Sequence, residues 1–440
     1  MGNCETKVRK NTNKSKEKCV EKNEQNGRED RDIEISLITS FEGEKTYFRY
    51  NISEFLRQHK SNERSDNRIS KANEFVRLLD GKVHVSASDS RYRYIYEGID
   101  TIVHRLVEEL GKVDPFFKYT KLRKTGSISS DVKVGLPHEA DYVLELPKNK
   151  TLSCGTKMDG QMLYDMINAI TEEKNAELTM GLDHWVIYGI KSHRHIEGIC
   201  LIMECQSDSP RFATVGVTVD IVPVYVETET EETYNEKARA FLPYSLQEYA
   251  QREELYRLVN KDACDTGLIE NAVMKGLPDD IKRPFRVVKF LLQNLVTTRF
   301  ISFKRDVIIE EDLCRNLYGY KPFLPSYQLR VIFLHLLLGI QGTEAEKELK
   351  GGLLALCLLD MLKQMSVVVR IYSGPYYACL YHPLIEQRVE NFPYCLDYIT
   401  IEQWDRILRY FETENAAEVV DKFKLLNDMN DEKSFVAYYS

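Results

Sequence analysis

The segment from Thr125 to Leu146 reads T-G-S-I-S-S-D-V-K-V-G-L-P-H-E-A-D-Y-V-L-E-L, and it constrains the fold more than any other part of the chain. It opens on Gly126-Ser127 and carries Glu139 and Asp141 at the head of an apolar run. Because strand side chains alternate between two faces, carboxylates at positions i and i+2 project from the same face. Glu139 and Asp141 are therefore predicted to bind the same cations.

A third carboxylate, Asp220, lies in a valine-rich segment. Residues 213–224 read A-T-V-G-V-T-V-D-I-V-P-V, and period-two alternation sets Asp220 on the face opposite its apolar neighbours. These neighbours are Val215, Val217, Val219 and Ile221. Burial of an unpaired charge costs on the order of several kcal/mol, so a carboxylate in so apolar a strand needs a matching cation. Two divalent ions shared with Glu139 and Asp141, Mg²⁺ or Mn²⁺, would supply it, because such ions prefer carboxylate oxygens, phosphates and water.

This set of groups suits phosphoryl transfer, in which a protein mainly positions phosphates and neutralises their charge. Gly126 permits close approach of the backbone to a triphosphate, and Ser127 can donate its hydroxyl and amide groups to phosphate oxygens. For an acidic pair considered alone, a solvated strand edge is the plain alternative. The ordered combination of a Gly-Ser turn, an acidic pair and a third carboxylate favours a metal site. Asp220 is further predicted to help deprotonate an attacking hydroxyl.

The Thr125–Leu146 segment resembles the signature of the male-abnormal-21 family, which includes cyclic GMP-AMP synthase and the cGAS-like receptors. Residues 283–295, R-P-F-R-V-V-K-F-L-L-Q-N-L, are similar to the family helix whose lysine touches the nucleotide, which implies that role for Lys289. The similarity extends over residues 45–430, and its most specific part is the segment from Thr125.

Residues 324–335, L-P-S-Y-Q-L-R-V-I-F-L-H, are similar to the serine-tyrosine helix of the same family. That similarity implies that Ser326 contacts a triphosphate and that Tyr327 stacks on a base. One family segment is not matched: where the family has an arginine and serines that read bases, residues 262–270 read D-A-C-D-T-G-L-I-E, and only Glu270 agrees. The choice of bases therefore stays open.

The resemblance implies an α+β, bilobal nucleotidyltransferase, in which a polymerase-beta-like mixed sheet with a spine helix precedes an all-helical C-terminal lobe. The periodicity is in keeping with this: an apolar stripe from Ser90 to Asp114 predicts the long helix, and helical patterns dominate from Leu246 onward. Residues 52–83 also read as one or two helices. The predicted divisions are a tail over residues 1–32, a catalytic core over 45–240 and a helical lobe over 246–440.

The implied activity is the joining of ATP and/or GTP into a cyclic dinucleotide second messenger, after a ligand is sensed, in innate immune signalling. The zinc-binding insertion of the DNA-sensing relative has no counterpart here, so if a nucleic-acid duplex activates the protein, double-stranded RNA is the better candidate; the activating ligand itself stays open. Basic residues near the long helix, Lys133 among them, could contact its phosphates, although interleaved acids also suit an ordinary solvated helix. Two alternatives are a catalytically silent scaffold or developmental protein and an enzyme that adds single nucleotides to RNA ends.

Composition and the N-terminus bear on location. The 440 residues are 43% hydrophobic with a net charge of −8, no apolar run is long enough for a membrane helix, and ten cysteines lack a disulfide framework, which predicts a cytoplasmic protein. The chain begins M-G-N-C-E-T, in which Gly2 fits a myristoylation motif and Cys4 is placed for a second acyl chain before a basic cluster. Membrane tethering through this tail is one hypothesis, and an ordinary solvated tail is the other.

Overall fold

The computed structural model describes residues 38–42, 45–60, 63–135, 139–147, 150–156, 158–192, 198–206, 214–226, 258–260, 263–265, 267–306, 326–340, 344–371, 380–381, 388–389, 399 and 401–423. These residues form a mixed structure of helices and strands, so the α+β class predicted from the sequence is confirmed at that level. The predicted acylation sites Gly2 and Cys4 lie outside the described residues. No helix within the described ranges is long and apolar enough to cross a membrane.

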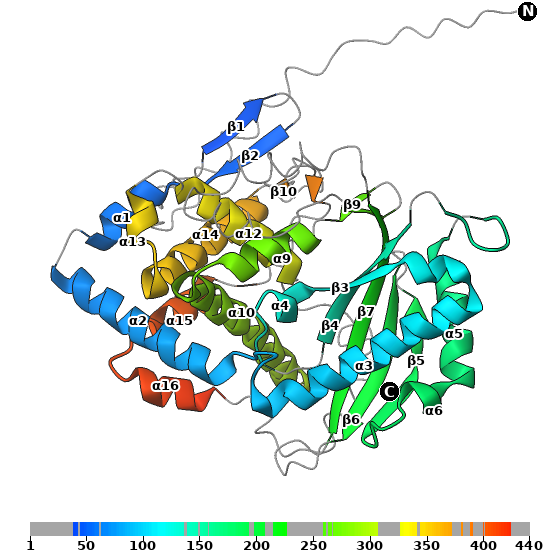
Figure 1. The fold of residues 1–440 in the computed structure, drawn as a ribbon. Coiled ribbons are helices and arrows are strands. Elements are labelled where there is room, and N and C mark those ends of the chain that lie inside the picture. The colour runs from blue at the N-terminus through cyan, green and yellow to red at the C-terminus, as the bar shows by residue number, and fades with distance from the viewer. Residues whose placement is uncertain are drawn as a thin grey trace, which may run out of the picture. The chain divides into compact units, whose positions relative to one another are not determined.

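A mixed sheet carries the segments that the sequence singled out (Figure 1). Its main strands follow the order β3-β4-β7-β6-β5, in which β4 and β7 are parallel and the other neighbours are antiparallel. The strand patterns predicted for Asp141–Leu146, 196–205 and 213–224 correspond to β4, β6 and β7. The strands are β3 (Lys121–Thr125), β4 (Glu139–Leu146), β5 (Trp185–Ser192), β6 (Ile199–Gln206) and β7 (Thr214–Val226).

One face of this sheet packs against α3 (Ser90–Val113), the long helix expected from the apolar stripe. Ile99, Ile102 and Leu106 of α3 share a buried cluster with alternate residues of the strands, such as Tyr142 and Val219. Further cover comes from α5 (Gly160–Glu173) and α6 (Asn175–Leu178), and a 3₁₀ turn at Pro115–Tyr119 follows α3. Because alternation is strict, Glu139, Asp141 and Asp220 fall on the face that is turned away from α3.

The remaining described helices share a second hydrophobic core. In it, α2 (Glu63–Val83) packs with α10 (Asp279–Asp306), α14 (Gly351–Ile371) and α16 (Ala416–Lys422), so the first long helix of the chain belongs with C-terminal helices. The other members are α1 (Ile52–Lys60), α9 (Gly267–Gly276), α12 (Ser326–Ile340), α13 (Ala345–Glu348) and α15 (Ile401–Tyr410).

Short strands interrupt the region for which the sequence predicts helices alone. A hairpin of β8 (Leu258–Asn260) and β9 (Ala263–Asp265) extends the main sheet from β7, and β10 (Leu380–Tyr381) pairs with β11 (Arg388–Val389). Strands of two or three residues are too short to show alternation, which is why the sequence pattern did not reveal them. Another hairpin, of β1 (Ile38–Glu42) and β2 (Lys45–Arg49), precedes α1.

Candidate metal centre

Strand register brings the predicted residues together in a row across the sheet. Asp141 of β4 lies directly beside Asp220 of β7, and Thr125 at the end of β3 lies beside Asp141 on its other side. Cys200 of β6 completes the row next to Asp220. Adjacent strands are about 4.8 Å apart, so this register alone makes the two aspartates neighbours. A slip of one residue in either strand would turn one carboxylate into the apolar core.

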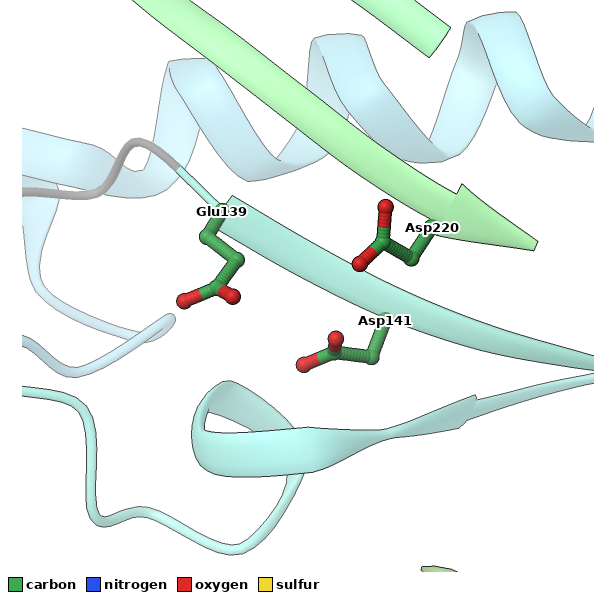
Figure 2. A group of neighbouring side chains, drawn as sticks. All are labelled: Glu139, Asp141 and Asp220. Atoms are coloured by element: carbon green, nitrogen blue, oxygen red, sulfur yellow. The ribbon is translucent and has the colours of Figure 1, made fainter. Parts of the chain in front are cut away.

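Glu139, Asp141 and Asp220 form one group, which we call the carboxylate triad. One oxygen from each lies within 4.8 Å of the others. Figure 2 shows the three carboxylate groups turned into the same space, two from β4 and one from β7. Three clustered hard oxygen donors are the ligands that Mg²⁺ and Mn²⁺ accept, so the residues present fit the predicted ions. The three acids that the sequence predicted as one site are therefore adjacent in the structure.

Repulsion among the three carboxylates acts on Asp141. Burial, together with repulsion from Glu139 and Asp220, raises the pKa of Asp141 to about 7, although Lys133 and Arg330 act in the opposite direction. At a pKa of about 7 the carboxyl group of Asp141 is about half protonated at neutral pH, and a bound cation would favour its ionised form. The arrangement thus favours the binding of positive charge between the three acids.

The Gly126-Ser127 turn lies directly against the side chain of Asp141. It forms α4 (Gly126–Ser129), whose backbone starts at Gly126 with a φ of 73°, and a Cβ at that position would collide with the Asp141 side chain. Only glycine satisfies both constraints. The turn is held by bonds from the Ser130 hydroxyl to the Gly126 carbonyl (2.6 Å) and from the Val132 amide to the Ser127 carbonyl (2.8 Å). The predicted phosphate-binding turn is thus rigid and directly beside the acids.

Two buried lysines lie against the triad. Lys133, only 3% exposed, donates to Glu139 Oε2 at 2.8 Å, so it is a counter-ion of the site and not a surface contact for a duplex as its place near the spine had suggested. Lys289 of α10, also 3% exposed, donates to the Val132 carbonyl at 3.3 Å. Burial and the repulsion of Lys133 lower the pKa of Lys289 to about 7, with Glu139 and Asp141 opposing the shift. The lysine named from the sequence is therefore close to the acids.

Helix α12 reaches the site through an arginine that the sequence interpretation did not assign. Arg330 is buried, lies 3.4 Å from Glu270 of α9, and its charge acts on both Asp141 and Lys289. Ser326, which is partly buried, precedes Arg330 by four residues and so shares its helix face, whereas the Tyr327 side chain is 36% exposed. No local pattern marks Arg330, because an arginine within an apolar helix reads as a surface residue.

Cys200 borders the triad from the β6 side. Burial and the neighbouring Asp220 carboxylate raise the pKa of its thiol, so the group is protonated and acts as a small neutral neighbour.

Comparison with known proteins assigns no family: no protein-family model matches the chain, and no curated protein matches it significantly.

Proposed function

We propose that this chain is a metal-dependent nucleotidyltransferase. The observation that carries the proposal is the convergence of Glu139, Asp141 and Asp220 from two neighbouring strands, beside a glycine turn that no other residue could form. Three converging carboxylates that repel one another favour bound cations, and a rigid turn with buried lysines around it suits an anion. A bound metal–polyphosphate complex satisfies both requirements at once. The mixed sheet with α3 on one face is compatible with a polymerase-beta-like catalytic core.

In this proposal each residue has a defined task. The triad holds two Mg²⁺ or Mn²⁺ ions, which when bound would neutralise phosphate charge and lower the pKa of a coordinated hydroxyl. Gly126 and Ser127 hold the triphosphate of the donor nucleotide through backbone and hydroxyl groups, and Lys289 adds a positive charge. Asp220 accepts the proton of the attacking ribose hydroxyl.

Ser326 and Tyr327 complete the nucleotide pocket from α12 in this proposal. Ser326 would contact phosphate oxygens, since it shares a helix face with the buried Arg330, and Tyr327 would stack on a base with its half-exposed ring. The resemblance to cyclic GMP-AMP synthase makes ATP and GTP the proposed substrates and a cyclic dinucleotide the proposed product. Activation by double-stranded RNA is the proposed trigger.

A scaffold without turnover is the less favoured alternative. A silent protein gains nothing from three acids that repel one another, and the raised pKa of Asp141 reflects that repulsion. Replacement of any one acid by its amide would relieve the repulsion while keeping the fold.

The direct test is an incubation of purified protein with labelled ATP and GTP, Mg²⁺ or Mn²⁺, and either double-stranded RNA, double-stranded DNA or no nucleic acid. A phosphatase-resistant product that is absent with the Glu139→Gln, Asp141→Asn variant would support the cyclase, and a product extended on an RNA primer would indicate a terminal transferase. Absence of any nucleotide-derived product, together with absence of nucleotide binding, would refute the proposal.

A further inference from the structure

The Arg330–Glu270 pair is unusual among the buried ion pairs that the structure describes. Glu270 is fully buried (0% exposed) and Arg330 is 8% exposed, yet their closest approach is 3.4 Å, between Arg330 Nε and Glu270 Oε2. Planar guanidinium groups normally meet buried carboxylates through two parallel short bonds. Here the contact is electrostatic, and Nε and Nη1 of the guanidinium make no hydrogen bond among the described residues.

Arg286 shows how a satisfied buried arginine looks in the same chain. It donates to both carboxylate oxygens of Asp80 at 2.6 and 2.7 Å, to Asp279 at 2.8 Å and to the Asp131 carbonyl at 3.1 Å. In contrast, Nε and Nη1 of Arg330 are sealed from solvent and have no hydrogen-bond partner among the described residues. A charged donor buried without an acceptor is costly, so a structural role alone does not account for Arg330.

The surroundings of Arg330 indicate which acceptor is missing. Arg330 lies close enough to the triad to lower the pKa of Asp141 and close enough to Lys289 to lower that pKa too. Lys133 and Lys289 are themselves buried beside the acids. Lys133 and Arg330 both repel the Lys289 ammonium group, so a ligand with several negative oxygens is favoured on this side of the site. Planar donor forks of arginine match phosphate oxygens in particular.

We propose that Arg330 is a phosphate-binding residue, which donates through its unpartnered guanidinium nitrogens to the polyphosphate chain of the nucleotide while Glu270 holds its side chain in place. This assignment rests on the proposed function and deepens it, because it makes the helical side of the site selective for a polyphosphate over a nucleoside. Glu270 acts as the positioning residue.

The experiment measures binding by calorimetry in the presence of Mg²⁺, with inorganic tripolyphosphate, ATP and adenosine as the probes. Arg330→Met should weaken the binding of tripolyphosphate and ATP by about 10- to 100-fold and leave any binding of adenosine unchanged, and Arg330→Lys should fall between Met and wild type. Lys282→Met is the matched control, since Lys282 is equally buried but donates to Asp131 in a different cluster. It should bind the probes as the wild type does.

Arg330→Met removes the Arg330 charge that lies 3.4 Å from the buried Glu270 carboxylate, so a second variant guards against a loss of folding. The double variant Glu270→Gln, Arg330→Met removes both charges and serves in that case, with thermal unfolding as the check on folding. Wild-type affinity for tripolyphosphate and ATP in a folded Arg330 variant would overturn the assignment. If the wild type binds ATP in a manner that Asp141→Asn abolishes while Arg330 variants bind equally well, only the assignment of Arg330 fails. If the wild type binds no probe at all, the proposed function fails with it.

Discussion

Asp131 and Lys133 are two residues apart in the chain, yet they belong to charge clusters of opposite kinds. The Asp131 carboxylate accepts from His84 at 2.9 Å and from Lys282 at 3.2 Å, and its backbone carbonyl, at a residue with a φ of 59°, accepts from Arg286. We call this cluster the Arg286 network; its members are Asp80, His84, Asp131, Asp279, Lys282 and Arg286. Lys133 instead faces the carboxylate triad.

The two clusters shift the pKa of their aspartates in opposite directions. In the Arg286 network each acid meets several donors, and the pKa of Asp131 falls to about 2 because bonds from His84 and the charge of Lys282 outweigh the effect of burial. In the triad the pKa of Asp141 rises to about 7. The bonds from His84, Lys282 and Arg286 hold the left-handed backbone conformation of Asp131, which lies between Ser127 and Lys133 in the chain. Repulsion among acids is found where a ligand is proposed to bind, so the contrast distinguishes a structural cluster from the candidate site within one loop.

The largest expected effect is on catalysis. Combined replacement Glu139→Gln, Asp141→Asn should reduce nucleotidyl transfer by at least about 10³-fold, because metal ions supply several kcal/mol of transition-state stabilisation. Initial rates with ATP and GTP measure the effect. Asp131→Asn is the control from the other cluster and should retain measurable turnover. Equal losses of nucleotidyl transfer in the two variants would contradict the separate roles given to the two clusters.

The next effect is on stability and concerns the Arg286 network. Arg286→Met removes both hydrogen bonds to the buried carboxylate of Asp80, although its 3.6 Å ion pair with Arg283 remains, and should lower the free energy of unfolding by about 3–5 kcal/mol. Urea denaturation followed by circular dichroism measures it. The double change Asp80→Asn, Arg286→Met should cost less than Arg286→Met alone, since no charge is then stranded. A loss below about 1 kcal/mol for the single change would show that the network is not structural.

The pH dependence of stability should have opposite signs at the two aspartates. The folded pKa of Asp141 lies above its value near 3.9 in the unfolded chain, so in metal-free protein the unfolded state releases this proton first and stability falls as pH rises from about 4 to 7. Asp131 has a depressed folded pKa, and its contribution is present above about pH 4 and disappears as pH falls through 2.

Unfolding of the wild type, Asp141→Asn and Asp131→Asn between pH 3 and 8, without divalent ions, isolates the two contributions. At pH 8 the Asp141→Asn variant should be more stable than wild type by on the order of 1 kcal/mol, whereas Asp131→Asn should be less stable. Addition of Mg²⁺ should stabilise the wild type and leave the Asp141→Asn variant unmoved. A destabilised Asp141→Asn variant at pH 8 would contradict the claim that burial and repulsion from its neighbours disfavour the charged form of Asp141.

The smallest effect concerns Lys133. Lys133 forms an ion pair with Glu139 and so competes with a cation for that carboxylate. Lys133→Met removes this positive charge and should raise the affinity for Mn²⁺ by roughly 3- to 10-fold. Calorimetric titration of the metal without nucleotide measures it. Lys282→Met, which removes a lysine of the Arg286 network, should leave the affinity as in wild type. A weaker Mn²⁺ affinity in the Lys133 variant would give this lysine a supporting role in the metal site.

Much of the site could be predicted because it depends on period-two alternation within strands. Glu139 and Asp141 share a face of the sheet for that reason. For the same reason Asp220 lies on the face opposite Val217 and Val219, which are in the hydrophobic core. The long helix α3 was visible for a similar reason, since its apolar stripe extends over its whole length. Local patterns of this kind are properties of single elements.

What could not be predicted depends on partners that are distant in the chain. Alternation alone does not give the adjacency of Asp141 and Asp220, which was predicted from the ordered combination of motifs and which results from the parallel pairing of β4 with β7. Helix α2 shows an apolar stripe, but the stripe does not reveal that its partners are α10 and α14. Arg330 meets Glu270 across two helices, so its burial and its unused donors emerge only from packing.

The central claim is that the carboxylate triad binds divalent ions together with a nucleotide, and a Mn²⁺ titration followed by electron paramagnetic resonance tests it most directly. In the presence of a non-hydrolysable ATP analogue, the wild type and the Asp131→Asn variant should each bind two Mn²⁺ ions per chain, as two-metal phosphoryl transfer requires. The Glu139→Gln, Asp141→Asn variant should bind none at the same concentrations. Equal binding by this variant and the wild type, or no binding by either, would contradict the claim.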